Sequence, residues 1–277
     1  MSATAARPDA RLREVADGVF LIERAHVNCY LIVDDDGLTL VDAGLPGSWG
    51  PLLATLRALG RRPGQIAGLV LTHGHFDHVG VARRFAERGI PIWAHPGDLR
   101  LVRHPYRYAH EAARIRYPLT HPRAVPVLGR MALAGALTVR GVDASGELQD
   151  GTPVDLPGRP VPVWSPGHTD GHCGFHLPDR GVLLSGDALV TLDPYTGEIG
   201  PRAVARAATA DSTQALESLA RLETTAGPGR CCRATANRGR TASPAPPTSH
   251  GRPASPDGSA PRVRRSRAGT RAPRRRP

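Results

Sequence analysis

Lysine is absent from this sequence, so all 36 of its basic side chains other than histidine are arginine. We attribute that bias to a GC-rich coding sequence and not to a binding role. The sequence also lacks the N-terminal apolar run of a signal peptide, and no later run approaches the length of a membrane span. These absences predict a cytoplasmic location by default. In that reducing compartment we expect the 4 cysteines to be thiols and not disulfides.

Acidic residues are nearly missing from the end of the chain. From Ala226 onward the sequence has 13 arginines and one acid, Asp257, for a net charge of +12. Residues 1–225 hold 23 arginines and 24 acids, for a net charge of −1. Residues 226–277 also lack hydrophobic periodicity and consist mostly of Arg, Pro, Ala, Gly, Ser and Thr. We therefore expect them to form a disordered tail.

The basic tail has two interpretations. An arginine-rich arm can bind nucleic acid through phosphate contacts. Alternatively, GC-rich DNA that is read out of frame yields Arg, Pro, Ala and Gly. We favour the second interpretation because the tail contains no aromatic residue to stack on bases. Nucleic acid is therefore not an expected partner.

Residues 1–225 alternate strand and helix patterns, which predicts an α/β fold in one domain. Apolar runs bounded by polar or glycine turns predict an antiparallel meander at 18–23, 28–33 and 38–44. A helix follows, capped by Ser48 and ended by Gly60. A buried strand, a helix and a second strand then form a βαβ-like unit, with predicted ranges 67–72, 79–88 and 91–95.

The second half of the domain has a less regular pattern. Residues 98–140 contain helical stretches broken by prolines, and such an insertion forms either a lid or pocket wall, or surface helices that only pack on the core. Strand patterns resume at 161–172, and 174–189 predicts a hairpin. A last helix begins at Asp211 or Ser212.

The stretch Leu71–Gly80, LTHGHFDHVG, concentrates metal-binding side chains. His73 and His75 alternate as residues do where they leave the end of a strand, whereas the adjacent Asp77 and His78 must point differently. Neutral imidazoles and carboxylates are the ligands that a borderline cation such as zinc accepts. One segment can therefore supply two neighbouring metal positions, although each position needs further ligands from elsewhere in the chain.

Two later sites offer those ligands. His168 lies in SPGHTDGH and Asp187 in LSGDAL, each just after a strand-like run and beside glycine, which lets the backbone turn tightly. With these motifs the sequence resembles the metallo-β-lactamase superfamily over residues 18–225, nearest to its glyoxalase II-like hydrolases. The resemblance implies an αββα sandwich with a dinuclear metal site at one edge of its sheets.

The resemblance also implies a role for each matching residue. His73, His75 and His168 would hold the first metal ion, Asp77 and His78 the second, and Asp187 would bridge the two. Asp42 would support the site by hydrogen bonding. His172 and His176 match no ligand position, and we interpret them as supporting or structural residues. Zinc is the expected metal, with iron and manganese as alternatives.

The chemistry implied is hydrolysis by a hydroxide bound to two metal ions, with Asp77 as the catalytic residue that orients it. The sequence has no G-x-S-x-G nucleophile elbow, so a serine nucleophile is not indicated. We expect the substrate to be a small-molecule thioester, lactone or other ester. A nucleic-acid-processing metallo-nuclease and a non-catalytic remnant of the fold are the alternatives, and the sequence leaves the oligomeric state open.

One ligand of the family pattern is missing. The family uses a further histidine in a late GHG-like loop, where this chain reads GPGRCCRATANRGRT. The only later histidine is His250, and fixing the flexible segment around it would cost about 1–2 kcal/mol per residue. We therefore expect the second metal position to be incomplete, and the last strand and helix of the sandwich to be lacking.

A frameshift near Ala226 is one hypothesis for this loss. With GC-rich codons, reading from the last base of the Arg230 codon yields Val-Leu-Pro-Gly-His-Gly-Glu-Pro-Trp. That translation contains a strand end followed by the absent histidine loop, in the part of the chain where the family has it.

Overall fold

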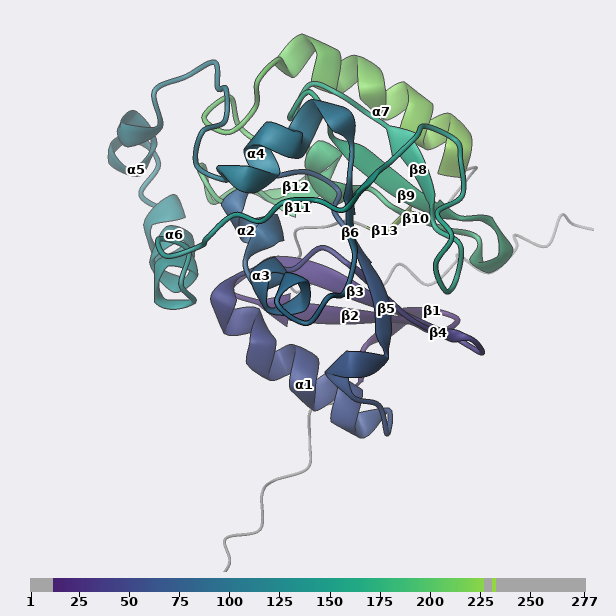
Figure 1. Ribbon diagram of the computed structural model, residues 1–277. Coiled ribbons are helices and arrows are strands. Elements are labelled where there is room, and N and C mark those ends of the chain that lie inside the picture. Colours follow the sequence, from purple (N-terminus) through teal and green to yellow (C-terminus); the bar gives the residue numbers. More distant parts are fainter. Residues whose placement is uncertain (1–11, 227–230, 233–277) are drawn as a thin grey trace, which may run out of the picture. The chain divides into compact units, whose positions relative to one another are not determined.

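The computed structural model describes residues 12–226 and 231–232 (Figure 1). Its larger sheet has seven strands in sequential order. β1 to β4 form the predicted antiparallel meander, and β5, β6 and β7 continue the sheet in parallel. The strands are β1 (Glu14–Ala16), β2 (Val19–Arg24), β3 (Val27–Asp34), β4 (Gly37–Val41), β5 (Ile66–Val70), β6 (Ile92–Ala94) and β7 (Gly146–Glu147).

A second sheet has the order β13-β10-β9-β8, and a two-stranded ribbon joins β11 to β12. The predicted hairpin over 174–189 is confirmed by the antiparallel pair β9 and β10. Gly181 ends its turn with a φ of +57°, which glycine adopts without strain. The strands are β8 (Val161–Trp164), β9 (Cys173–Leu177), β10 (Val182–Leu184), β11 (Val190–Leu192), β12 (Ile199–Arg202) and β13 (Cys231–Cys232).

Helices cover the outer faces of both sheets (Figure 1). Those used below are α1 (Trp49–Ala58), α2 (Phe76–Val79), α3 (Ala82–Ala86), α4 (Leu99–Arg103), α5 (Tyr117–Thr120), α6 (Ala124–Leu133) and α7 (Ser212–Ala226). Among the helices in the described ranges, none has both the length and the apolar character that crossing a membrane requires.

The core is layered because side chains alternate between the two faces of each strand. Leu31 packs with Leu56 of α1 and Phe85 of α3 on one face of the large sheet. Its neighbour Ile32 packs on the other face, in a cluster that includes Leu184 of the second sheet. The remaining face of the second sheet packs against α7, where the buried side chains include Leu183 and Leu222. Helix, sheet, sheet and helix follow one another, which confirms the expected αββα sandwich.

The helix predicted over 79–88 is wrong in one respect, because the structure divides that stretch between α2 and α3. Gly80 and Val81 donate backbone hydrogen bonds to the carbonyls of Gly44 and Ala43, at 2.8 and 3.1 Å, and so leave the helical pattern. A Cβ at Gly80 would lie 2.2 Å from the Gly44 carbonyl oxygen, so only glycine allows this close approach.

Three described residues fall in the segment assigned to the tail: Ala226 ends α7, and Cys231–Cys232 form a short strand. Cys231–Cys232, assigned to a disordered tail, pairs in parallel with β10 as β13. The pairing places Cys232 opposite Leu184, so the chain leaves β13 at the same end of the sheet from which β10 leads to Asp187. The rest of the predicted tail, including His250 and the expected loss of a last helix, lies outside the described residues.

Candidate metal centre

The six side chains predicted as metal ligands come together where β5, β8 and β10 end. His73 and His75 follow β5, and α2 directly after them carries Asp77 and His78. The loop after β8 carries His168, and the short 3-10 helix Gly186–Ala188 after β10 carries Asp187. All six are buried, with at most 6% of any residue exposed. The three chain segments therefore meet in one interior cluster.

Three imidazoles form the first group of this cluster. The Nε2 atom of His168 lies 3.2 Å from Nε2 of His73 and 3.1 Å from Nδ1 of His75. Ligands at about 2.05 Å from a tetrahedral zinc ion lie about 3.3 Å from one another. The distances from Nε2 of His168 to the nitrogens of His73 and His75 are therefore close to the distance between two ligand atoms in a tetrahedral zinc site.

A second group lies beside the first and shares its members. The Nε2 atom of His78 is 3.4 Å from Oδ1 of Asp187 and 3.9 Å from Oδ2 of Asp77. The other oxygen of Asp187, Oδ2, faces the first group, 3.7 Å from Nε2 of His168. The two carboxylate oxygens of Asp187 therefore point to different groups, which is the arrangement that a bridging ligand needs.

Several polar atoms of the cluster are buried without a hydrogen-bond partner. They are Nε2 of His75 and His78, Nδ1 of His168, and Oδ1 of Asp187. Leaving such an atom unpaired costs about 1–3 kcal/mol. Nε2 of His78 and Oδ1 of Asp187 lie 3.4 Å apart, and a shared cation would offset the cost for these two atoms. Nε2 of His75 and Nδ1 of His168 lie on the opposite side of their rings from the nitrogens that approach each other. Two overlapping sets have ligand atoms within 4.8 Å of one another, namely His73, His75 and His168, and His73, His78 and Asp187. The donor set fits divalent metal binding.

The protonation states of the first group agree with that fit. Burial is the main cause that holds the pKa values of His73, His75 and His168 well below the usual range, so these rings are neutral near pH 7. Neutral imidazole is the form that binds metal.

His78 differs, because burial is outweighed there by the carboxylates of Asp42, Asp187 and Asp77, which raise its pKa well above the usual range. Burial also raises the pKa of Asp77 to about 6, because an isolated carboxylate is poorly solvated there; His78 opposes the shift and Asp187 adds to it.

Asp42 contacts both Thr72 and His78, which lie at opposite ends of the histidine-rich segment. Its carboxylate accepts hydrogen bonds of 2.8 Å from the backbone N–H and the hydroxyl of Thr72, and lies 2.9 Å from Nδ1 of His78. When the Nδ1–H of His78 donates to Asp42, the Nε2 lone pair faces the cluster. The supporting position expected for Asp42 thus has a direct hydrogen-bonding partner in His78.

Asp98 was not singled out from the sequence, yet it ties the two histidine loops together. Its buried carboxylate accepts hydrogen bonds from the backbone N–H of Gly74 at 2.8 Å, the Thr169 hydroxyl at 2.8 Å and the Gly171 N–H at 2.9 Å. A signal was available, because Asp98 follows β6, the parallel neighbour of β5. The carboxyl ends of adjacent parallel strands lie at the same edge of a sheet.

The remaining histidines have different positions. His172 is buried, with Nδ1 2.9 Å from the Ser165 hydroxyl and its ring centroid 5.3 Å from that of His73, so it packs beside the cluster. Burial lowers its pKa to about 4. His176 lies on β9 and is partly exposed. His250 lies outside the described residues.

Aromatic side chains from the 98–140 insertion form a wall of the cluster. The rings of Tyr108 and His75 have centroids 4.1 Å apart, and Tyr106 stacks on Phe76 at 5.4 Å. Elsewhere the insertion packs on the core, since Val127 and Met131 of α6 belong to a buried cluster with residues from β3. Both interpretations of the insertion therefore describe part of it.

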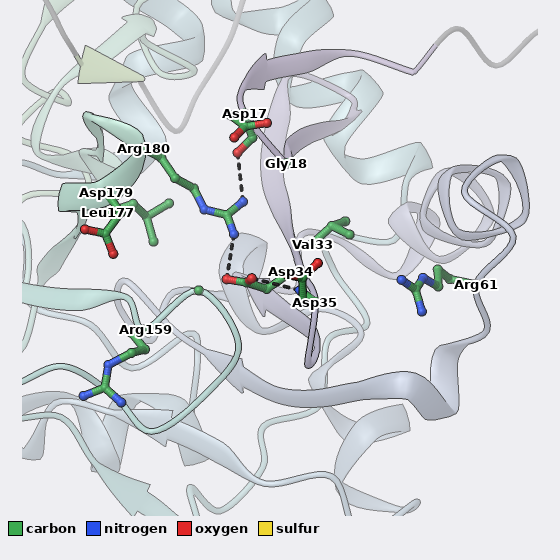
Figure 2. Close-up of a pocket in the computed structure, with 11 residues that line it drawn as sticks. Asp17, Gly18, Val33, Asp34, Asp35, Arg61, Arg159, Leu177, Asp179 and Arg180 are labelled. Carbon is green, nitrogen blue, oxygen red and sulfur yellow. Dashed lines mark hydrogen bonds and ion pairs between the residues drawn. The ribbon is translucent and has the colours of Figure 1, made fainter.

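A separate pocket of about 530 Å³ is lined by charged residues (Figure 2). The Arg180 guanidinium donates to the backbone carbonyl of Asp17 and to the carboxylate of Asp34, both at 2.8 Å. Arg180 lies in the β9–β10 turn, at the end of that hairpin away from Asp187. The contacts connect the second sheet to the first at a distance from the metal-binding cluster.

The layered fold and the histidine–aspartate cluster at the edge of its sheets together define a class of metallo-hydrolases. The family model described as the metallo-beta-lactamase superfamily matches residues 22–226, and the chain belongs to that family. The family was predicted from the sequence, and the prediction is confirmed.

Individual proteins of known sequence or structure are also similar to this chain. The chain is 30% identical to the probable metallo-hydrolase YflN of Bacillus subtilis over 65% of this chain and 67% of that protein. It is 28% identical to the hydroxyacylglutathione hydrolase GloC of Haemophilus influenzae over 62% of this chain and 69% of that one. Among solved structures, the family protein TTHA1429 of Thermus thermophilus is similar with a TM-score of 0.58 and 26% identity, over 81% and 75% of the two chains.

Proposed function

We propose that this chain is a metal-dependent hydrolase that acts on a thioester, lactone or other ester. The observation that carries the proposal is the convergence of three buried imidazoles, in which Nε2 of His168 lies within 3.2 Å of both other rings. Beside them lies a carboxylate with both oxygens turned to the cluster. Nε2 of His78 and Oδ1 of Asp187 are buried in this cluster without a hydrogen-bond partner, which supports a cation between them.

In this proposal each predicted ligand has a defined task. His73, His75 and His168 would hold one cation, His78 and Asp77 would hold a second, and Asp187 would be a ligand shared by the two positions. When bound, the two cations lower the pKa of water and polarise the substrate carbonyl. Zinc is the expected metal, because imidazole and carboxylate suit it, and iron and manganese accept the same ligands.

Asp77 is the proposed catalytic residue. Its carboxylate accepts the proton of the attacking water and delivers it to the leaving group. Its position supports this role, because its Oδ2 lies 3.9 Å from Nε2 of His78, inside the cluster where the attacking water would be held. Tyr108, which packs on the ring of His75, limits the access of bulk water to the reacting atoms.

The kind of cluster and the relatives support this choice of substrate class. GloC is named as a hydroxyacylglutathione hydrolase, which makes a thioester the first substrate to test. The nuclease alternative rests on the arginine-rich segment 226–277, most of which lies outside the described residues. The ester-hydrolase proposal rests on a cluster of described residues, so we prefer it to the nuclease alternative.

The proposal is tested by measuring metal content and hydrolysis on one protein preparation. We expect metal after dialysis, by inductively coupled plasma mass spectrometry, and hydrolysis within a panel of thioesters, lactones and esters. Asp187→Asn is expected to lose both metal and activity, whereas the matched control Asp179→Asn, in the exposed β9–β10 turn, retains both. Metal-loaded protein that hydrolyses no member of the panel would contradict the proposal.

A further inference from the structure

Two segments distant in the sequence meet beside His75. Tyr108 comes from the 98–140 insertion, and Tyr195 from the turn between β11 and β12. Their hydroxyl oxygens are 2.8 Å apart and share one hydrogen bond. Two hydroxyls that share one hydrogen bond keep one further O–H hydrogen available for donation. The pair therefore presents a hydrogen-bond donor next to a ligand of the proposed metal centre.

Arg114 adds a positive charge to this wall. Its guanidinium carbon lies 4.1 Å from the centroid of the Tyr108 ring, which in turn lies 4.1 Å from the centroid of His75. Two successive contacts thus connect the arginine to the cluster. Arg114 belongs to the short helical turn Arg114–Arg116 and is partly buried.

Among the described residues, no carboxylate forms an ion pair with Arg114. Arg103 pairs with Asp143 and Arg206 with Glu111, whereas other arginines of the insertion, such as Arg116, also have no ion pair in the described part of the chain. The distinguishing contact of Arg114 is the one with the ring of Tyr108. A partly buried guanidinium held against an aromatic face offers several N–H donors in one plane, and its best partner is the planar carboxylate. The single positive charge of Arg114 balances the single negative charge of a carboxylate, and a tyrosine hydroxyl supplies one further hydrogen bond.

We propose that Arg114, together with the Tyr108–Tyr195 hydroxyl pair, binds a carboxylate group of the substrate. The inference rests on the proposed function, because it describes a part of the substrate that lies beside the bond being hydrolysed. It narrows the substrate to a small thioester or ester that carries a carboxylate near its reacting carbonyl. Arg114 and the two tyrosines are then specificity-determining residues, and the cluster supplies the chemistry.

A matched pair of substrates tests the inference. S-acetyl-3-mercaptopropionate and S-acetyl-3-mercaptopropionamide have the same thioester and the same length, and only the first is charged. We expect the metal-loaded protein to hydrolyse the carboxylate with a kcat/KM about 10–100-fold above that of the amide, as charge-assisted hydrogen bonds imply. Arg114→Gln is expected to bring the ratio close to one, and Arg114→Lys to retain part of it.

The control is Arg116→Gln, which removes an exposed arginine from the same helical turn. This variant is expected to keep the wild-type ratio. Equal kcat/KM values for the two substrates in the wild type would overturn the inference, and so would an Arg114→Gln variant that keeps the preference. Thermal unfolding of both variants shows whether any loss comes from the fold.

A binding measurement separates this inference from the hydrolase proposal. The ketone 3-(acetonylthio)propionate and its amide resemble the thioesters but are not hydrolysed. Isothermal titration calorimetry on the metal-loaded protein is expected to give tighter binding of the carboxylate in the wild type and in Arg116→Gln, but not in Arg114→Gln. With that result and no thioester turnover, the subsite stands and the hydrolase proposal fails. Hydrolysis without any charge preference, in turnover and in binding, would overturn the subsite and leave the hydrolase proposal standing.

Discussion

The carboxylate of Asp98 accepts a 2.8 Å hydrogen bond from the backbone N–H of Gly74, the residue between His73 and His75. The same carboxylate accepts hydrogen bonds from Thr169 and Gly171, which flank the turn after His168. One buried side chain therefore holds the two loops that bring the three imidazoles together. A Cβ at Gly74 would lie 2.7 Å from the backbone nitrogen of Val102, so this loop has little room to move.

Replacing Asp98 is expected to weaken metal binding without touching a proposed ligand. Asp98→Ala leaves three donors unpaired, two of them backbone N–H groups, and frees both loops. We expect metal affinity to fall by about 10–100-fold, as is usual when a group that orients metal ligands is lost. Chelator competition measures the affinity. Asp170→Asn, a neighbouring exposed carboxylate, is the control, and equal affinities for the two variants would show that Asp98 does not position the ligands.

Replacing Asp42 is expected to affect the two metal positions unequally. Asp42 has a φ of +60°, a conformation that asparagine also tolerates, so Asp42→Asn retains the backbone. The amide no longer fixes the ring of His78 as a carboxylate does. We expect affinity at the position served by His78 to fall about 10–100-fold. The three-histidine position is expected to change less, because Asp42 reaches it only through the Thr72 hydroxyl, which lies 3.0 Å from Nδ1 of His73. Metal titration followed by calorimetry distinguishes tight binding at the three-histidine position from the weaker binding expected at the incomplete second position. An equal loss at both would contradict this assignment.

Restoring the other reading frame tests the proposed gap in the second position. β13 leaves the sheet at the end where β10 leads to Asp187, so a loop after β13 starts near the cluster. Replacing residues 231–239 with VLPGHGEPW is expected to raise the metal content towards two ions per chain. The control carries VLPGAGEPW, which has alanine in place of the histidine. Equal metal content in the two variants would count against the frameshift hypothesis.

The pair Arg180 and Asp34 predicts a pH-dependent part of stability. The Asp35 backbone N–H, and to a lesser degree Arg180, hold the pKa of Asp34 below its usual value even though partial burial opposes the shift. A lowered folded-state pKa means that the stabilisation is present above the usual pKa of about 4 and is lost as pH falls through the folded value. Since Asp34 is partly exposed, we expect less than about 1 kcal/mol.

Chemical unfolding of wild type and Asp34→Asn across that range measures the contribution. The difference in unfolding free energy is expected to be constant near neutral pH and to shrink in acid. Asp36→Asn, in the adjacent turn, is the control. A wild-type advantage that grows as pH falls would contradict the sign derived from the lowered pKa of Asp34.

Much of the candidate site could be predicted because it is encoded locally. His73, His75, Asp77 and His78 lie within six residues, and the strand before them fixes where they emerge. His168 and Asp187 also follow strand-like runs, so their position at a sheet end follows from the same rule. The broken helix at Gly80 could not be predicted, because the cause is a hydrogen bond to Gly44, which is distant in sequence.

The sequence by itself determined the ligand types, their spacing, the family and the layered α/β fold, since hydrophobic period and strand ends are local properties of a chain. The tertiary structure decided which other side chains surround the cluster. Asp98 lies 24 residues from Gly74 and 73 from Gly171, and Tyr108 lies 87 residues from Tyr195. Contacts of that kind depend on how loops pack against one another. Hydrophobic periodicity in the sequence does not predict such packing.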